Sequence, residues 1–264
     1  MPIRSLPLLF LLATCDKAAP SSSPADGAGT LFLWIGADRD AFTTCSLSTS
    51  CTDGGPNNAL AGEIQVANEE QLEQKRSYVH FALPTLPADA VIERAYLELY
   101  NPATMGDGRS DDLCIPVVRL LEPWDPFTLD WQNQPLASAM GGESALSLRS
   151  NAWSSADVTV AVREHYADPA TNHGFALYVP AGVQADKGFY SNNATSRTVD
   201  DLGLAPRLLL EVTSERGGEL RFPQTLDEST DLPFRGASAL MGRAVVADDW
   251  PDDWAVAGDD GRCL

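Results

Sequence analysis

The histidines and carboxylates are the residues of this sequence that could serve acid–base or metal chemistry. His80, His165 and His173 stand far apart, and none lies in the paired-histidine helix motif of zinc proteases. The chain has no Gly-x-Ser-x-Gly turn and no glycine-rich phosphate loop. With 37 Asp and Glu residues, carboxylate pairs arise at any spacing, so a glycosidase assignment depends on their separation in space. The sequence therefore predicts a protein that is not an enzyme, with a hydrolase as the remaining alternative.

Four tyrosines are candidates for contact with sugar rings, because flat aromatic faces flanked by polar groups bind amphipathic ligands. Alternation along the chain places Tyr78, Tyr96 and Tyr100 on an outward face, and Tyr190 lies in a later segment. The competing interpretation is that these rings cover a sheet face or contact the C-terminal segment. The tryptophans interpreted as core or corner packing are Trp34, Trp131 and Trp153.

The charge balance restricts which polymers the chain could bind. It has 18 Lys and Arg against 37 Asp and Glu, a formal net charge of −19. Such a surface repels nucleic-acid phosphates and anionic lipids. An anionic polysaccharide would need a local basic patch or bridging Ca²⁺, which favours a neutral glycan. The basic residues that could contribute are scattered: Arg76, Arg94, Arg109 and Lys187.

One acidic run could hold a hard cation. The stretch Gly106-Asp107-Gly108-Arg109-Ser110-Asp111-Asp112 gathers carboxylates around glycines, and Ca²⁺ prefers such oxygen ligands. The run lacks the distal glutamate of a complete calcium loop. We therefore predict a solvated acidic turn and no cofactor, with Ca²⁺ as the alternative.

The cysteines indicate an oxidising compartment. Of five cysteines, Cys45, Cys51, Cys114 and Cys263 remain when Cys15 is set aside, and four cysteines allow three pairings. A Cys45–Cys51 bond would close a short loop rich in Ser and Thr, and would leave Cys114 and Cys263 to attach the C-terminal end to the domain. Zinc is the alternative, but the chain has no Cys-x-x-Cys and no nearby histidine pair. Disulfides are the prediction.

Residues 1–14 have the pattern of a signal peptide. Arg4 precedes about ten apolar residues, too few to span a membrane. The sequence Leu12-Ala13-Thr14-Cys15 resembles a bacterial lipobox and predicts lipidation of Cys15; an ordinary signal peptide is the alternative. Residues 15–29 lack large apolar side chains and predict a flexible tether. We expect a secreted or cell-envelope protein whose membrane contact is a lipid anchor.

Short strands separated by turns must position these residues. Residues 76–83 alternate, with Val79, Phe81 and Leu83 on one face, and residues 91–100 alternate in the same way. Residues 160–167 show helical spacing and end at Asp168-Pro169. Further strands are expected at 30–35, 113–121, 174–179, 187–191 and 207–213.

These elements predict an all-β fold, an antiparallel β-sandwich of jelly-roll type with one short helix. The sandwich is expected over residues 30–214. Residues 215–264 are rich in acids and predict a loosely ordered tail whose end Cys263 would fix.

A series of motifs follows in order along the chain: Arg76–Phe81, Ile92–Tyr100, Trp124–Pro135, Trp153 with Asp157–Thr159, Asn172–Leu177, Phe189–Ser191 and Pro206–Leu208. Their order and spacing resemble the DNRLRE-domain family of secreted bacterial and archaeal proteins, over roughly residues 30–214. The resemblance implies a β-sandwich module that is usually non-catalytic. Some relatives are described as carbohydrate-binding modules for acidic polysaccharides such as alginate.

Two features depart from that family. No Arg-Glu pair stands near Ser191-Asn192-Asn193, and residues 42–56 form an insert with two cysteines. No binding residue is therefore transferred. The predicted function is a non-catalytic extracellular or cell-surface module that binds a polysaccharide or cell-surface glycan. The alternative is a structural or adhesive protein whose sandwich is a spacer or a protein-contact unit, and the oligomeric state stays open.

Overall fold

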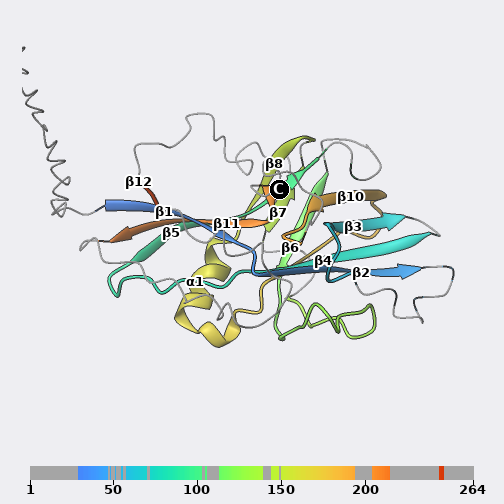
Figure 1. Cartoon of the computed structure of the whole chain (residues 1–264), viewed down its shortest axis with the longest axis horizontal. Coiled ribbons are helices and arrows are strands. Elements are labelled where there is room, and N and C mark those ends of the chain that lie inside the picture. The colour runs from blue at the N-terminus through green and yellow to red at the C-terminus, as the bar shows by residue number, and fades with distance from the viewer. Residues whose placement is uncertain are drawn as a thin grey trace, which may run out of the picture.

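The computed structural model describes residues 29–46, 48, 51, 55, 58–69, 72–102, 105, 113–138, 144–148, 150–193, 204–214 and 244–246. Its strands pair antiparallel in two sheets, accompanied by a short α-helix and a 3₁₀ turn (Figure 1). The prediction of an all-β sandwich with a short helix is confirmed. No helix in these ranges is long and apolar enough to cross a membrane.

The first sheet has five strands in the order β12-β1-β11-β5-β8. A bulge between Glu211 and Val212 shifts the register of β11 on β5. The strands are β12 (Ala244–Val246), β1 (Gly29–Gly36), β11 (Arg207–Ser214), β5 (Val91–Asn101) and β8 (Ala152–Asp157).

The second sheet has seven strands, with the path β10-β3-β4-β9-β6-β7 and β2 paired to β4. Because β2 pairs along all of β4, β3 and β9 share the opposite edge of β4 in succession. The strands are β10 (Ala185–Tyr190), β3 (Glu63–Glu69), β4 (Glu73–His80), β9 (Phe175–Tyr178), β6 (Cys114–Arg119), β7 (Ser144–Ser147) and β2 (Arg39–Ser46).

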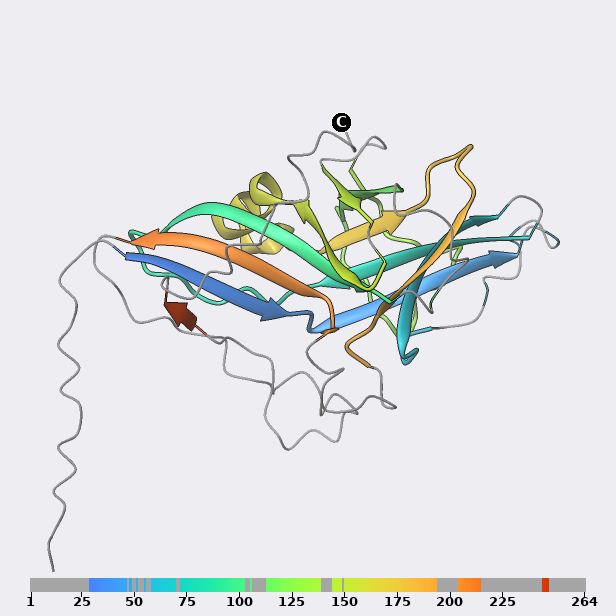
Figure 2. The same ribbon diagram turned by 90° about the horizontal axis from the view of Figure 1, so that it is seen from above.

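The chain passes from the first sheet to the second between β1 and β2. The backbone N–H of Ala37 donates to Pro206, beside β11, and that of Asp38 donates to His80 of β4. The two strands consequently follow one another along the long axis of the molecule (Figure 2). One continuous stretch of chain therefore joins the two sheets directly.

The core lies between the sheets and takes the inward side chain of every second residue, as the alternation predicts. Burying such a side chain stabilises the fold by about 1.5–3 kcal/mol. The most deeply buried members, each 0 % exposed, include Leu33, Leu97, Leu99, Leu208 and Leu210 of the first sheet and Val79, Ile115, Leu177 and Phe189 of the second.

A smaller apolar cluster lies on the outer face of the second sheet, beneath residues 121–138, the 121–138 loop. Trp124 closes it: the indole Nε1–H donates to the His173 carbonyl at 2.8 Å, and the Arg39 guanidinium lies 5.3 Å from the ring centre. This loop therefore covers part of the sheet. The cluster consists of Ala41, Tyr78, Val118, Leu120, Trp124, Leu129 and Ala176.

The helix α1 (Thr159–Ala167) follows β8 directly and confirms the helical prediction for 160–167. Asp157 accepts hydrogen bonds from the backbone N–H and the hydroxyl of Thr159 at 2.9 and 2.5 Å. Arg163 donates to the carbonyls of Ile92 and Glu93 at 2.8 and 3.0 Å, which ties the helix to the start of β5. Pro169 follows the end of the helix at Asp168, where a proline cannot continue it.

Strands over 91–100, 187–191 and 207–213 were predicted within a few residues, but β2, β3, β7, β8 and β12 were not. The strand β2 was assigned in part to an insert. Its residues Asp40–Thr43 are all buried, so the sequence carries no polar–apolar alternation there. Within the range assigned to the tail, Ala244–Val246 pair with Leu31–Leu33 of β1. The signal segment 1–14, the tether up to residue 28 and the remainder of the tail lie outside the described residues.

Candidate functional site

Three aromatic side chains meet where Tyr100 of β5 contacts both Trp153 of β8 and Tyr190 of β10. The ring centres of Tyr100 and Tyr190 are 6.0 Å apart, and the ring planes are 16° from parallel. Trp153 meets Tyr100 edge-on, with centres 5.7 Å apart. Rings stacked directly face to face would have centres about 3.5–4.0 Å apart, the distance of atoms in contact. Because these centres are 6.0 Å apart, the two tyrosine rings are offset from one another. All three side chains are partly exposed.

The strand pattern places these rings. In β5, Leu97 and Leu99 enter the core, so Glu98 and Tyr100 point outward. Tyr100 lies opposite Trp153 in the β5–β8 register, and Glu98 lies opposite Arg207 in the β5–β11 register. These residues therefore form one group on the outer face of the first sheet. The Tyr100 cluster is defined as Glu98, Tyr100, Trp153 and Arg207 together with Tyr190, which β10 of the second sheet contributes.

Arg207 joins the aromatic rings to a buried acid. Its guanidinium carbon lies 3.7 Å from the centre of the Trp153 ring, and its Nε donates to Glu98 Oε2 at 2.6 Å. Glu98 is 2 % exposed. Burial raises the pKa of Glu98, and the Arg207 charge partly offsets that effect. The ion pair holds the guanidinium over the indole ring, a contact of about 0.5–2 kcal/mol.

Tyr190 is positioned by the buried carboxylate of Asp40, which is 1 % exposed. Asp40 accepts hydrogen bonds from the Ser191 hydroxyl at 2.6 Å and the Asn192 backbone N–H at 2.7 Å. The Asn193 amide adds a bond at 3.3 Å. The chain immediately after Tyr190 is therefore fixed by a carboxylate from β2 and not by a local Arg-Glu pair.

The structure brings two of the four predicted tyrosines together, Tyr100 and Tyr190, and separates the other two. Tyr96 lies on the same face of β5, partly exposed, and makes no ring contact in the described part of the chain. Burial raises the pKa of Tyr96. Tyr78 lies on the second sheet.

The expectation that Tyr78 offers an outward ring needs correction. Its ring lies on the outer face of β4, but Trp124 of the 121–138 loop packs 5.8 Å away and the residue is 2 % exposed. Its hydroxyl donates to Gln134 Oε1 at 2.7 Å, and burial raises the pKa of Tyr78 to about 12. Tyr78 therefore supports the loop and cannot stack on a ligand.

The three tryptophans interpreted as core or corner packing are all partly exposed, so none is a fully buried core residue. Trp34 of β1 alternates with the core residues Leu33 and Ile35, so it points away from the core. Trp153 belongs to the Tyr100 cluster. Trp131 lies in the 121–138 loop.

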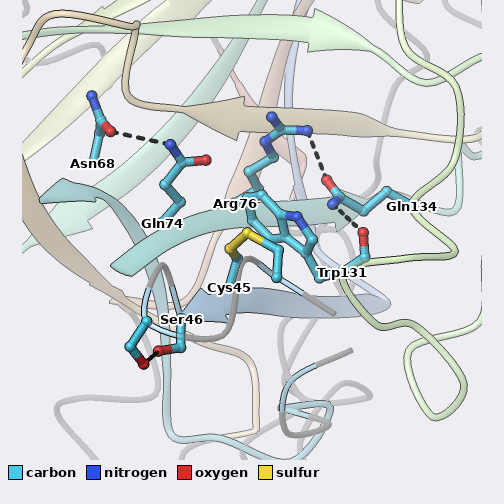
Figure 3. Close-up of a disulfide and its surroundings, with 9 residues drawn as sticks. Cys45, Ser46, Asn68, Gln74, Arg76, Trp131 and Gln134 are labelled. Carbon is cyan, nitrogen blue, oxygen red and sulfur yellow. Dashed lines mark hydrogen bonds between the residues drawn. A yellow bond between two sulfur atoms is a disulfide. The ribbon is translucent and has the colours of Figure 1, made fainter. Parts of the chain in front are cut away.

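Trp131 forms a second arginine–aromatic contact. The Arg76 guanidinium carbon lies 4.7 Å from the Trp131 ring centre, and Arg76 Nη1 donates to Gln134 Oε1 at 2.9 Å. Gln134 Nε2 donates to the Trp131 carbonyl at 2.6 Å. Figure 3 shows this arrangement in the surroundings of the disulfide at Cys45.

The Cys45–Cys51 disulfide is confirmed, with a Cα–Cα distance of 4.8 Å. Cys114 begins β6, whereas Cys15 and Cys263 lie outside the described residues, so lipidation and the Cys114–Cys263 bond stay predictions. The acidic run 106–112 also lies outside them. Within the described ranges, no group of three or more His, Cys, Asp or Glu side chains could hold a metal ion.

The histidines serve packing and hydrogen bonding. The two ring nitrogens of His80 lie 2.6 Å from Asp38 Oδ1 and 3.2 Å from the Asn172 carbonyl oxygen. His165 is 2 % exposed and packs edge-on against Phe175. Neither histidine is arranged to activate a nucleophile in the described part of the chain.

A cleft of about 710 Å³ lies between residues 83–92 and α1. Aliphatic and proline side chains form most of its wall, and Tyr166 and His165 supply the aromatic rings. The charged group in the wall, Arg163, is bound to two backbone carbonyls of β5. This cleft is thus less suited to a sugar than the Tyr100 cluster.

The Tyr100 cluster has the composition of a sugar-contact surface, with flat ring faces beside a guanidinium and a carboxylate. Sequence reasoning found Tyr100 and Tyr190 through alternation and missed Trp153 and Arg207. Trp153 was not predicted to face outward because β8 was not predicted as a strand. Arg207 was not predicted as a site residue because its position there depends on its contact with Glu98, which is 109 residues away in the sequence.

Comparison with family models finds a match over residues 48–201 to carbohydrate-binding module family 96. The matched range contains Glu98, Tyr100, Trp153 and Tyr190 of the cluster, and also Arg76 and Trp131. Comparison with curated proteins finds no match.

Proposed function

The chain belongs to carbohydrate-binding module family 96, and on that premise we propose that it is a non-catalytic module that binds a polysaccharide at the Tyr100 cluster. The observation that carries the proposal is the meeting of Tyr100, Trp153 and Tyr190 from three strands. Rings fixed by a sheet lose little conformational freedom when a ligand binds. The adjacent Arg207 supplies N–H donors for sugar hydroxyls, and the buried Glu98 holds its guanidinium in place.

The finer features of the proposal come from the sequence. The module is of the DNRLRE type, is exported, and is held at a bacterial membrane by a lipid on Cys15. The net charge of −19 disfavours an anionic polymer, so the ligand is a neutral glycan.

Affinity electrophoresis of the full chain through gels containing neutral and acidic polysaccharides, each with and without Ca²⁺, tests the proposal. We expect retardation by a neutral polymer without need of Ca²⁺. Tyr190→Ala removes one ring of the cluster and should weaken binding about tenfold, since an aromatic contact contributes about 1 kcal/mol or more.

Tyr96→Ala is the matched control, because it also removes a partly exposed tyrosine ring, one that lies outside the cluster on the same face of β5 as Tyr100. It should bind as the wild type does. If no gel retards the wild type, the proposal is wrong and the spacer or protein-contact function takes its place. If Tyr96→Ala and Tyr190→Ala weaken binding equally, the assignment to the Tyr100 cluster fails.

A further inference from the structure

Trp131 and Arg76 lie on the outer face of the second sheet, away from the Tyr100 cluster. Arg76 of β4 alternates with the buried residues Ser77 and Val79, and its register partner Tyr178 of β9 alternates with the core residue Leu177. The side chains of Arg76 and Tyr178 therefore point outward together. Both are partly exposed, as is Trp131 above Arg76.

The arginine and the tryptophan are held in place before any ligand arrives. Gln134 accepts from Arg76 at 2.9 Å and from the buried Tyr78 at 2.7 Å, and it donates to the Trp131 carbonyl at 2.6 Å. One amide thus fixes the Arg76 side chain and the backbone of Trp131, whose ring lies against the Arg76 guanidinium. Such preorganisation lowers the entropic cost of binding.

Polar groups on this surface remain available to a ligand. A guanidinium carries five N–H donors, and Gln134 takes one donor of Arg76. In the described part of the chain, no carboxylate lies within ion-pair distance of Arg76, and neither the Tyr178 hydroxyl nor the Trp131 indole N–H has a hydrogen-bond partner. Although the chain has a large excess of acids, the side chains that Arg76 contacts in the described part of the chain, Gln134 and Trp131, are both neutral.

A row of side chains extends this surface across the sheet. Val117 of β6 pairs with Leu177, which places Pro116 beside Tyr178, and Pro116 in turn pairs with Ala145 of β7. The row from Arg76 to Ala145 spans three strand spacings, or about 14 Å. It has polar donors at one end and flat or small apolar groups at the other, all partly exposed. The row thus offers hydrogen-bond donors for the hydroxyls of an extended sugar chain and apolar groups for its C–H faces.

We propose that Trp131, Arg76 and Tyr178, the Trp131 surface, form a second glycan-binding site, so that one chain can hold two polysaccharide strands. The proposal rests on the proposed function, because it takes the same class of ligand. The Trp131 surface lies on the outer face of the second sheet, whereas the Tyr100 cluster is built on β5, β8 and β11 of the first sheet with Tyr190 added from β10 of the second. The two sites share no residue, so each can hold its own strand of polymer. Simultaneous engagement would raise the apparent affinity for a polymer by tenfold or more over that for a short oligosaccharide.

Calorimetric titration of the full chain with xylohexaose, cellohexaose, mannohexaose and a mannuronate hexamer tests the second site. For the hexasaccharide that binds, we expect two molecules per chain in the wild type. Tyr190→Ala and Trp131→Leu should each retain one, and the double variant should bind none. Tyr178→Ala is a second variant at the Trp131 surface and should behave as Trp131→Leu does, provided that both keep the wild-type melting temperature.

Phe127→Leu is the matched control, because Phe127 is a 44 % exposed aromatic residue of the same loop. It should bind two hexasaccharides. One hexasaccharide in the wild type, lost in Tyr190→Ala and kept in Trp131→Leu, would overturn the second site and leave the proposed function intact. One hexasaccharide in the wild type, kept in Tyr190→Ala and lost in Trp131→Leu, would place the binding site at the Trp131 surface and refute the assignment to the Tyr100 cluster. Absence of binding by any hexasaccharide or polymer would refute both proposals.

Discussion

His165 is a titratable residue buried where its charge would be costly. It lies on the inward side of α1, 2 % exposed, and its Nε2 has no hydrogen-bond partner among the residues that the structure describes. Burial lowers the pKa of His165 to about 4, and the charges of Arg119, His80 and His173 act in the same direction. The native state therefore holds a neutral imidazole over a range in which an unfolded histidine takes up a proton.

The sign of the pH effect follows from that difference. Protonation of the unfolded chain below its pKa of about 6.5 draws the equilibrium toward unfolding until the native residue also titrates near 4. Between pH 7.5 and pH 5 the His165 contribution to the free energy of unfolding should fall by about 2 kcal/mol. Urea unfolding of the wild type and of His165→Leu at both pH values measures it. Parallel losses in the two proteins would contradict the assignment to His165.

A disulfide near the C-terminal end of β2 can be removed by substituting its two cysteines. The disulfide joins Cys45 to Cys51, six positions apart, beside the strand β4 that carries Arg76. Closing so short a loop stabilises the fold by about 2 kcal/mol through the unfolded state. The double variant Cys45→Ala, Cys51→Ala should lower the free energy of unfolding by that amount in guanidinium titration. An unchanged midpoint would show that the loop is already ordered without the bond.

Elements with a solvent-facing side could be predicted from the sequence, and elements without one could not. The alternation of β5 is visible because Leu97 and Leu99 are apolar while Glu98 and Tyr96 are polar. In β2 both sides of the strand are buried, so no pattern marks it. The site depends on contacts between distant segments, such as Arg207 on Trp153, which no local pattern contains. The burial of Tyr78 beneath the 121–138 loop could not be predicted either, because it depends on contacts with Trp124 and Gln134, which are distant in the sequence.

At the scale of the whole molecule, a predicted N-terminal lipid would place two proposed glycan sites beside a membrane. Cys15→Ser should move the protein from the membrane fraction to the soluble fraction of a bacterial host, because one sulfur carries the proposed diacylglycerol anchor. Fractionation and labelling with radioactive palmitate measure the change, with Cys45→Ala, Cys51→Ala as a control that should remain membrane-bound. Unchanged fractionation of Cys15→Ser would refute the anchor.

The short strand β12 covers part of the edge of β1 in the first sheet. It pairs with Leu31–Leu33 of β1, a strand whose sequence Gly29–Gly36 is almost wholly apolar. An uncovered apolar edge strand offers a row of unpaired N–H and C=O groups to which a strand of another molecule can add. Cutting the chain after Ser214 would remove this cover, and the shortened protein would present a template for edge-to-edge aggregation. Residues 244–246, late in the sequence, would thus shield the edge of β1 from strands of other copies of this chain.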